Sequence, residues 1–180
     1  MHTKLDVHTI RNLAHGIKLL ILDVDGVMTD GGIILIGETL EAKRFNVQDG
    51  IGVRLALEIG LEVAIITSRE SVVVQRRATE LGIRNVLQNQ SDKVSALRHL
   101  LQKYGISCDA TAYIGDDLQD IPIMKLVGLP IAVCNASQKV KDISVFVTTA
   151  HGGHGAVREA VEWLLHLRAE QETAHKKITG

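Results

Sequence analysis

The 180-residue sequence predicts an α/β protein with a doubly wound, mostly parallel sheet, and two observations carry that prediction. First, short apolar stretches such as Leu19–Val24 and Leu61–Ile66 are typical of strands buried on both faces. Second, these stretches alternate with helical segments that begin at capping residues and end at glycine, as in βαβ units. The length suits one domain with a substantial core, so we expect a single domain over residues 1–180.

The first half of the chain predicts a leading helix, a buried strand, a hairpin, and then alternating helices and strands. The turn Ile36-Gly37-Glu38 between two short apolar segments indicates the hairpin, over about residues 32–45. Asp49 is expected to cap the next helix, and Gly82 to end a later one. The expected bounds are helix 3–15 (with Leu5, Ile10 and Leu13 on one side), strand 19–24, helix 51–59, strand 61–66, helix 71–81 and strand 83–87.

The second half continues the alternation. Ser91 is expected to cap a helix that ends before Gly105, and a short helix should follow the fourth strand as far as Val127. The polar tail 169–180 has no core to join, so it could reach into a partner's site or remain disordered, and we favour disorder. The expected bounds are helix 92–104, strand 111–114, strands 129–133 and 145–147, and a final amphipathic helix 155–168.

Composition excludes several functional classes. The formal net charge of −1 shows no electrostatic footprint for nucleic acid or anionic lipid. No apolar run approaches the roughly 20 residues of a membrane span, and the polar N-terminus lacks the apolar segment of a signal peptide. Cys108 and Cys134 are isolated, which fits a reduced, cytoplasmic protein.

The stretch LLILDVDGVMTD, residues 19–30, places Asp23 and Asp25 at the end of the first strand. Ionised carboxylates are costly beside a buried strand unless a cation or hydrogen bonds compensate them. Open α/β sheets bind their ligands at this carboxyl edge. Capping of a turn is the alternative interpretation of the two acids. We favour a metal site that includes a nucleophile.

Three more polar residues follow at places that this topology brings to the same edge. Thr67 ends the second strand, Lys93 opens a helix, and Asp116 ends the fourth strand. Lys93 is informative because a cation in the first turn of a helix opposes the helix dipole. Taken alone, Thr67 also fits an ordinary strand-end hydroxyl, and Lys93 a solvated surface lysine. Asp117 also fits an N-cap and Asp120 a first-turn acid of the following helix, and for Asp120 we favour that structural interpretation.

Together, these acids, the hydroxyl and the ammonium favour phosphoryl transfer. Attack by the Asp23 carboxylate on a phosphate dianion brings negative charges together, so nearby cations must neutralise them. Carboxylate-region oxygens favour Mg²⁺, a hard cation that bridges to substrate phosphate. Thr67 and Lys93 would hold the phosphoryl oxygens. Asp25 would protonate the leaving alkoxide and later deprotonate the attacking water.

The segments DVDGV, Thr67, Lys93 and GDDLQD, in this order, resemble the four motifs of the haloacid dehalogenase superfamily of phosphatases. The resemblance implies an Asp23 nucleophile and an Asp25 general acid/base. It also implies a magnesium ion held by the Asp23 carboxylate, the Asp25 backbone carbonyl and Asp116. The short spacings from Asp30 to Thr67 and from Lys93 to Asp116 leave no room for the cap domain that many members insert.

Further segments resemble the capless 3-deoxy-D-manno-octulosonate 8-phosphate phosphatases of that superfamily: LDVDGVMTDG, FNVQDG, IITSR and GGHGAVRE, within about residues 17–165. This resemblance implies hydrolysis of an eight-carbon sugar-acid phosphate in lipopolysaccharide biosynthesis. It also implies a homotetramer whose hairpins assemble together and whose neighbouring subunits complete each site. Arg69 would contact the sugar acid or phosphate, although a surface arginine fits equally well. Residues 152–155 would lie near a neighbour's site, or simply form a glycine-rich helix entry.

Three alternatives remain open at this point. Phosphatases of related nine-carbon sugar acids carry the same motif set. Receiver domains also place an aspartate, a hydroxyl residue and a lysine at strand ends, but their phosphoacceptor lies on a later strand. A catalytically inactive scaffold would not need the intact set of Asp23, Asp25, Lys93 and Asp116.

Overall fold

The computed structural model describes the backbone of residues 6–179 and the side chains of residues 6–169. Within these residues, six strands form one sheet in the order β5-β4-β1-β6-β7-β8, and every neighbouring pair is parallel. The strands of this sheet are β1 (Leu19–Leu22), β4 (Glu62–Ile66), β5 (Asn85–Leu87), β6 (Thr111–Gly115), β7 (Leu129–Ala132) and β8 (Phe146–Val147). The predicted doubly wound parallel sheet is therefore confirmed.

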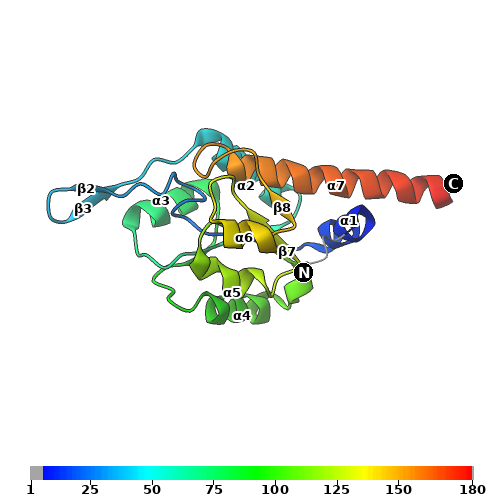
Figure 1. Ribbon diagram of the computed structural model, residues 1–180, viewed down its shortest axis with the longest axis horizontal. Helices are drawn as coiled ribbons and strands as arrows, with labels where there is room; N and C mark the ends of the chain where they lie inside the picture. Colours follow the sequence, from blue (N-terminus) through cyan, green and yellow to red (C-terminus); the bar gives the residue numbers. More distant parts are fainter. Residues whose placement is uncertain (1–5, 180) are drawn as a thin grey trace.

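Helices cover both faces of the sheet (Figure 1). Helices α1, α2 and α7 pack together on one face, and α4, α5 and α6 on the other. The helices are α1 (Val7–Gly16), α2 (Val47–Glu58), α3 (Val72–Leu81), α4 (Lys93–Tyr104), α5 (Ile121–Met124), α6 (Gln138–Ile143) and α7 (Ala156–Thr179), with short 3₁₀ turns η1 (Cys108–Ala110) and η2 (Leu118–Asp120). Among the described residues, no helix has both the length and the apolar character needed to cross a membrane.

The predicted hairpin is also confirmed. Strands β2 (Ile34–Ile36) and β3 (Leu40–Ala42) pair antiparallel as a separate two-stranded sheet. The hairpin projects from the body at one end of the molecule, and α7 extends from the opposite end (Figure 1).

The central strand β1 fixes where a ligand can bind. Its four residues are all buried, and it lies between β4 and β6. After β1, the chain forms β4 and β5 on one side of this strand and then β6, β7 and β8 on the other side. The direction in which strands are added therefore reverses between β1 and β6. Ligands of open α/β sheets bind at such a switch point, outside the carboxyl ends of the strands.

Several expected helix boundaries are wrong, although the elements exist. The leading helix is confirmed from Val7, with Asp6 as its cap, while Leu5 lies outside the described residues. Helix α6 was not expected at all. The final helix does not end at Arg168 but continues to Thr179, so the expectation of a disordered tail is wrong for its backbone. The side chains of 170–180 lie outside the described residues.

Two capping predictions were also wrong. Helix α4 is capped by Asp92, whose side chain accepts from the backbone N–H groups of Val94 and Ser95, and not by Ser91. Helix α2 is capped by Asn46 rather than by Asp49. The buried carboxylate of Asp49 instead accepts from the backbone N–H groups of Gly155 and Arg158, at 3.2 and 3.1 Å. Asp49 therefore caps the distant helix α7, because packing of α2 against α7 puts that helix start within reach.

Candidate active site

Acidic side chains meet at the switch point between β1 and β6. The backbone N–H of Asp23 donates to the carbonyl of Ile114 at 3.1 Å, which continues the β1–β6 ladder by one residue. Asp116 follows β6 directly. Carboxylate oxygens of Asp23, Asp116 and Asp120 all lie within 4.8 Å of one another. The edge that the sequence predicted is therefore where the structure gathers these acids.

Lys93 brings a buried positive charge to this cluster. Its ammonium lies 3.0 Å from Asp23 Oδ1 and 2.6 Å from Asp120 Oδ1, and the side chain is 3% exposed. Burial alone lowers the pKa of Lys93, but the attraction of Asp23 and Asp120 outweighs it and the net pKa is raised. Lys93 is therefore a charged group of the site, and the surface interpretation of this residue is wrong.

Asp120 has a larger role than the first-turn acid that the sequence suggested. It is fully buried, and its Oδ1 accepts from Lys93 and, at 2.7 Å, from the hydroxyl of Tyr113. Its Oδ2 accepts from the backbone N–H groups of Asp116 and Asp117, at 3.0 and 3.2 Å. The predicted first-turn position is confirmed, and the contacts of Oδ1 with Lys93 and Tyr113 go beyond it. Asp120 orients Lys93 and fixes the loop that carries Asp116.

Two carboxylate oxygens at this edge have no hydrogen-bond donor in the described part of the chain, and they are suitable ligands for a hard divalent cation. Asp23 Oδ2 and Asp116 Oδ1 are buried and have no hydrogen-bond partner among the described residues. Burial, followed by repulsion from Asp120, raises the pKa of Asp23 to about 7. Burial and repulsion from Asp23 raise the pKa of Asp116 to about 7. Both oxygens of Asp120 already have donors, so Asp23 and Asp116 are the carboxylates that would hold Mg²⁺.

A tight turn after β1 shapes the loop that carries Asp25. The carbonyl of Val24 accepts from the backbone N–H groups of Val27, Met28 and Thr29. Gly26 has a φ of +92°, and a Cβ there would lie 2.0 Å from Asp116 Oδ2. Only glycine allows this loop to pass so close to Asp116.

Asp25 itself lies against one residue of the hairpin and one of the loop after β4. The ammonium of Lys43, just after β3, contacts Asp25 Oδ1, and Arg69 Nε lies 3.5 Å from Asp25 Oδ2. Arg69 Nη2 also lies 3.2 Å from Glu41 Oε2, on β3. A hydrogen bond with Ser71 and the charges of Lys43 and Arg69 lower the pKa of Glu41. The sequence reasoning missed Lys43 and Glu41, since no motif spacing links the hairpin to β1.

Thr67 and Arg69 lie in the loop that follows strand β4. Thr67 is buried, and its backbone N–H and carbonyl bond to Leu87 and Gln90, which holds the strand end in place. Ser68 Oγ donates to Gln119 Oε1 at 3.0 Å, tying this loop to the loop after β6. Arg69 is half-exposed and has two carboxylate partners, so it is more than a solvated surface arginine.

The glycine-rich segment 152–155 packs on this chain's own loop after β1. The backbone N–H of Gly153 donates to the carbonyl of Val27 at 2.9 Å, and that of Gly152 to Asn135 Oδ1 at 2.8 Å. A Cβ on Gly152 would lie 1.6 Å from the carbonyl oxygen of Gly26. The segment therefore supports the loop that carries Asp25.

We expect Gly152→Ala to destabilise the protein by about 1–3 kcal/mol, because the new methyl group must displace the Gly26 backbone. Any activity that depends on Asp25 should fall with it, since the displaced loop carries that residue. Urea unfolding measures the first effect. Gly16→Ala is the matched control, because no atom lies within 4 Å of a Cβ there, and it should be neutral. Equal stability of the two variants would contradict the close packing.

Stabilisation of the protein by a bound divalent cation should increase with pH. Without a cation, the pKa values of Asp23 and Asp116 are both raised from 3.8 to about 7. The contribution of these two groups to the free energy of unfolding is therefore fully present below about pH 4 and is lost as the pH rises through about 7. Magnesium competes with protons for these carboxylates. Thermal melts should show a larger stabilisation by Mg²⁺ at pH 8 than at pH 5.5, approaching about 2.7 kcal/mol at 100 times the Kd. An equal shift at both pH values would contradict the assignment.

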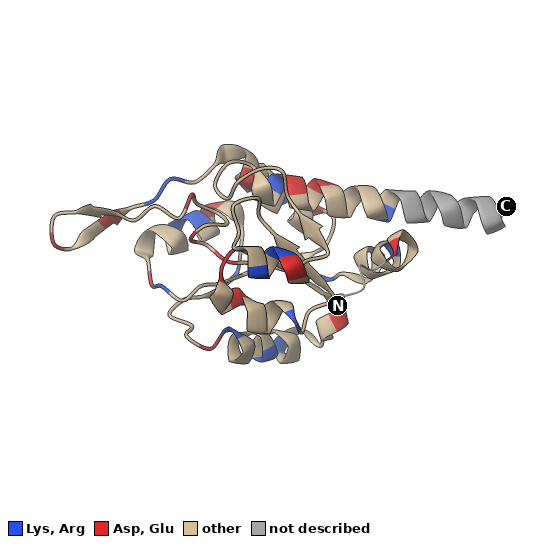
Figure 2. Ribbon diagram, viewed as in Figure 1, with Lys and Arg blue, Asp and Glu red and all other residues tan. Residues whose placement is uncertain are grey.

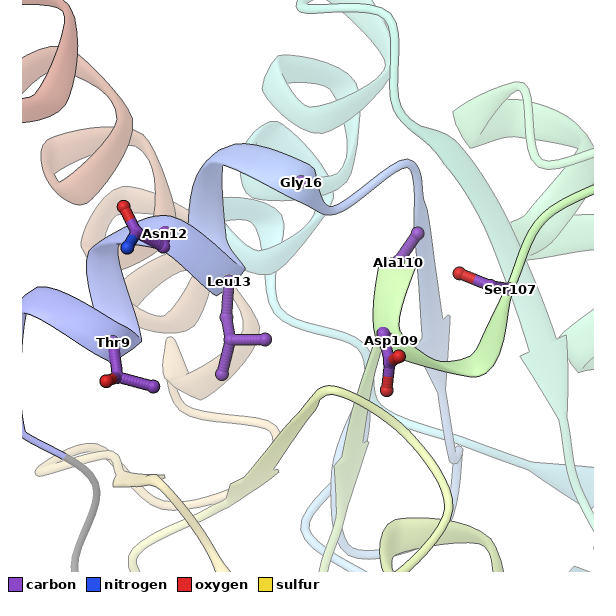
Figure 3. A pocket seen from close by; sticks show the side chains of 7 residues that line it. All are labelled: Thr9, Asn12, Leu13, Gly16, Ser107, Asp109 and Ala110. Carbon is purple, nitrogen blue, oxygen red and sulfur yellow. The ribbon is translucent and has the colours of Figure 1, made fainter. Parts of the chain in front are cut away.

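One small pocket among the described residues lies away from the acid cluster (Figure 3). Its volume is about 330 Å³, and it is lined by α1 and by η1 with its flanks, including Leu13, Gly16 and Asp109. These segments precede β1 and β6, so the pocket is at the amino ends of the strands, opposite the acid cluster. The acid cluster instead lies at the carboxyl ends of the strands, where the neighbouring side chains of Asp25 and Arg69 are partly exposed.

Comparison with known proteins adds independent evidence. A family model described as haloacid dehalogenase-like hydrolase matches residues 66–160. The 3-deoxy-D-manno-octulosonate 8-phosphate phosphatase of Escherichia coli K12 is 45% identical over 161 residues, which cover 89% of this chain and 86% of that protein.

Solved structures agree with this finding. The 3-deoxy-D-manno-octulosonate 8-phosphate phosphatase of Moraxella catarrhalis, in complex with magnesium ion, phosphate ion and KDO, superposes with a TM-score of 0.88 at 41% identity, covering 97% of this chain and 100% of that chain. The corresponding enzyme of Yersinia pestis gives a TM-score of 0.87 at 42% identity, covering 91% and 89%.

Proposed function

This chain belongs to the haloacid dehalogenase-like hydrolases, and we propose that it is a magnesium-dependent phosphatase that hydrolyses 3-deoxy-D-manno-octulosonate 8-phosphate. The observation that carries the chemistry is the cluster of buried Asp23 and Lys93 with partly buried Asp116 at the sheet's switch point. The observation that supports the substrate is the 45% identity to phosphatases of that name over most of the chain.

The proposed reaction has two steps. An Asp23 oxygen attacks phosphorus, an aspartyl-phosphate forms, and the sugar oxygen leaves with a proton from Asp25. Water then attacks phosphorus of that intermediate and gives a proton to Asp25. The bond between phosphorus and the Asp23 oxygen breaks, which releases inorganic phosphate and restores the Asp23 carboxylate. Lys93 stabilises the charge on Asp23 and the transferring oxygens, and the Thr67 hydroxyl holds one of those oxygens. Magnesium bound by Asp23, Asp116 and the backbone carbonyl of Asp25 would neutralise further phosphate charge.

Arg69 is the proposed substrate contact. It lies at the open edge with its side chain 42% exposed, beside Asp25 and therefore beside the leaving oxygen. A guanidinium there can bind the carboxylate of a sugar acid in a bidentate manner. That charge would favour acidic sugars over neutral hexose phosphates.

A phosphate-release screen across a sugar-phosphate panel tests this function. We expect the eight-carbon sugar-acid phosphate to give the highest kcat/KM, ahead of phosphoserine, phosphoglycolate and hexose phosphates. Preference for a nine-carbon sugar-acid phosphate would move the assignment to that related activity. Clear preference for any of the other esters would refute the substrate while sparing the chemistry.

We further propose that the protein is a cytoplasmic homotetramer in which a neighbouring subunit completes each site. Both cysteines are free within the described residues, as in a reducing compartment. Figure 2 shows the hairpin strands largely in tan, the colour of residues other than Lys, Arg, Asp and Glu. The large apolar side chains of the hairpin are exposed, with Leu35 at 72% and Leu40 at 64%. A contiguous exposed apolar surface of this kind is typical of an interaction site.

Light scattering should give the mass of a tetramer, and Leu35→Arg should shift the mass toward smaller species. The reason is that a charge on the hairpin must be desolvated when the apolar strands are buried. Leu126→Arg is the control, since it charges an exposed leucine of the body, 43% exposed, outside the hairpin. A fully active monomer would contradict the shared site.

A further inference from the structure

The hairpin reaches the chemistry through Lys43, a residue that neither the motifs nor the acid cluster includes. Lys43 directly follows β3, and its side chain is 1% exposed. A lysine is rarely buried to this degree unless its charge is paired, because desolvation disfavours the ammonium. The partner in the structure is Asp25 Oδ1.

The two oxygens of Asp25 have unequal partners. Lys43 makes a direct hydrogen bond to Oδ1, whereas Arg69 Nε lies 3.5 Å from Oδ2. The terminal torsion of an aspartate is soft, so a carboxylate without fixed contacts samples a broad range of orientations. A buried ammonium on one oxygen restricts that rotation and leaves the other oxygen for proton exchange.

We infer that Lys43 is a positioning residue that holds Oδ1 of Asp25 so that Oδ2 faces the leaving oxygen of the substrate. This inference rests on the proposed function, in which Asp25 protonates that oxygen. Lys43 does not touch the substrate and acts through Asp25. The hairpin thereby contributes to catalysis within its own chain, in addition to any role in assembly.

A leaving-group comparison separates this role from a structural one. The sugar alkoxide must be protonated as it leaves, whereas 4-nitrophenolate leaves without a proton. The value of kcat/KM reports the steps up to the first cleavage, before water attacks. Disordered Asp25 should therefore slow the sugar-acid phosphate and spare 4-nitrophenyl phosphate.

For Lys43→Met we expect kcat/KM to fall about tenfold or more for the sugar-acid phosphate and less than about threefold for 4-nitrophenyl phosphate. The quotient of the two values is independent of the concentration of active enzyme, so partial unfolding does not imitate the effect. Lys43→Gln serves in the same assay if Lys43→Met does not fold. Arg44→Met is the matched control, because Arg44 is 67% exposed and pairs with Asp30. Its quotient should stay at the wild-type value.

An unchanged quotient in the Lys43 variants, whether both substrates slow equally or neither slows, would overturn the inference. That result is distinct from failure of the proposed substrate, which appears in the wild-type protein as no activity on the sugar-acid phosphate. In that case the quotient is taken with the best aliphatic phosphate ester of the panel, and it tests Lys43 in the same way.

Discussion

Asp23→Asn is expected to reduce phosphate release by roughly four orders of magnitude or more, as for removal of a catalytic nucleophile. The amide is nearly the same size as the carboxylate, so the β1 ladder and the contact of Asp23 with Ile114 should persist. What is lost is the nucleophilic oxygen. Continuous phosphate detection with the preferred substrate measures the effect.

The matched control is Asp109→Asn. Asp109 is an exposed acid of η1 at the opposite edge of the sheet, so its loss should leave kcat unchanged. Thermal unfolding of Asp23→Asn should show no loss of stability in the absence of divalent cations, because a neutral amide removes one of the repelling buried carboxylates. If Asp23→Asn kept full activity, Asp23 could not be the nucleophile.

Lys93→Met is expected to lower the free energy of unfolding by about 3–5 kcal/mol at pH 8, the usual cost of removing one partner from a buried ion pair. The substitution leaves Asp23 and Asp120 facing each other without the ammonium that lies 3.0 and 2.6 Å from them. Urea unfolding in the presence of a chelator measures the loss. Phosphatase activity should also fall, since Lys93 no longer balances the attacking carboxylate.

This loss should have a pH dependence of known sign. The pKa of Asp23 is already raised to about 7, so at pH 5 the group is largely protonated and fewer uncompensated charges remain. The difference from wild type should therefore be smaller at pH 5 than at pH 8. Arg98→Met, which removes a cation from an exposed position of the same helix, should cost less than about 1 kcal/mol at both pH values. A similarly small loss for Lys93→Met would contradict its place in the buried cluster.

Local sequence signals predicted the helices and strands well where glycines or long apolar runs marked their ends. The apolar runs of β1 and β4 and the glycines after α3 and α4 led to the right strands and helix ends. Boundaries failed where two capping residues competed, as at Ser91 and Asp92. They also failed for the last helix, because a polar stretch without an apolar stripe has no periodic signal.

The sequence by itself determined the parallel sheet, the hairpin, and the edge where Asp23, Lys93 and Asp116 meet. The reason is that the apolar periodicity locates the strands, and the carboxyl ends of parallel strands lie at one edge. Only the tertiary structure decided that Asp120 holds Lys93, that Asp49 caps α7, and that Lys43 contacts Asp25. Each of these contacts joins segments distant in the chain. Their partners depend on how helices and the hairpin pack against the sheet, which no local pattern encodes.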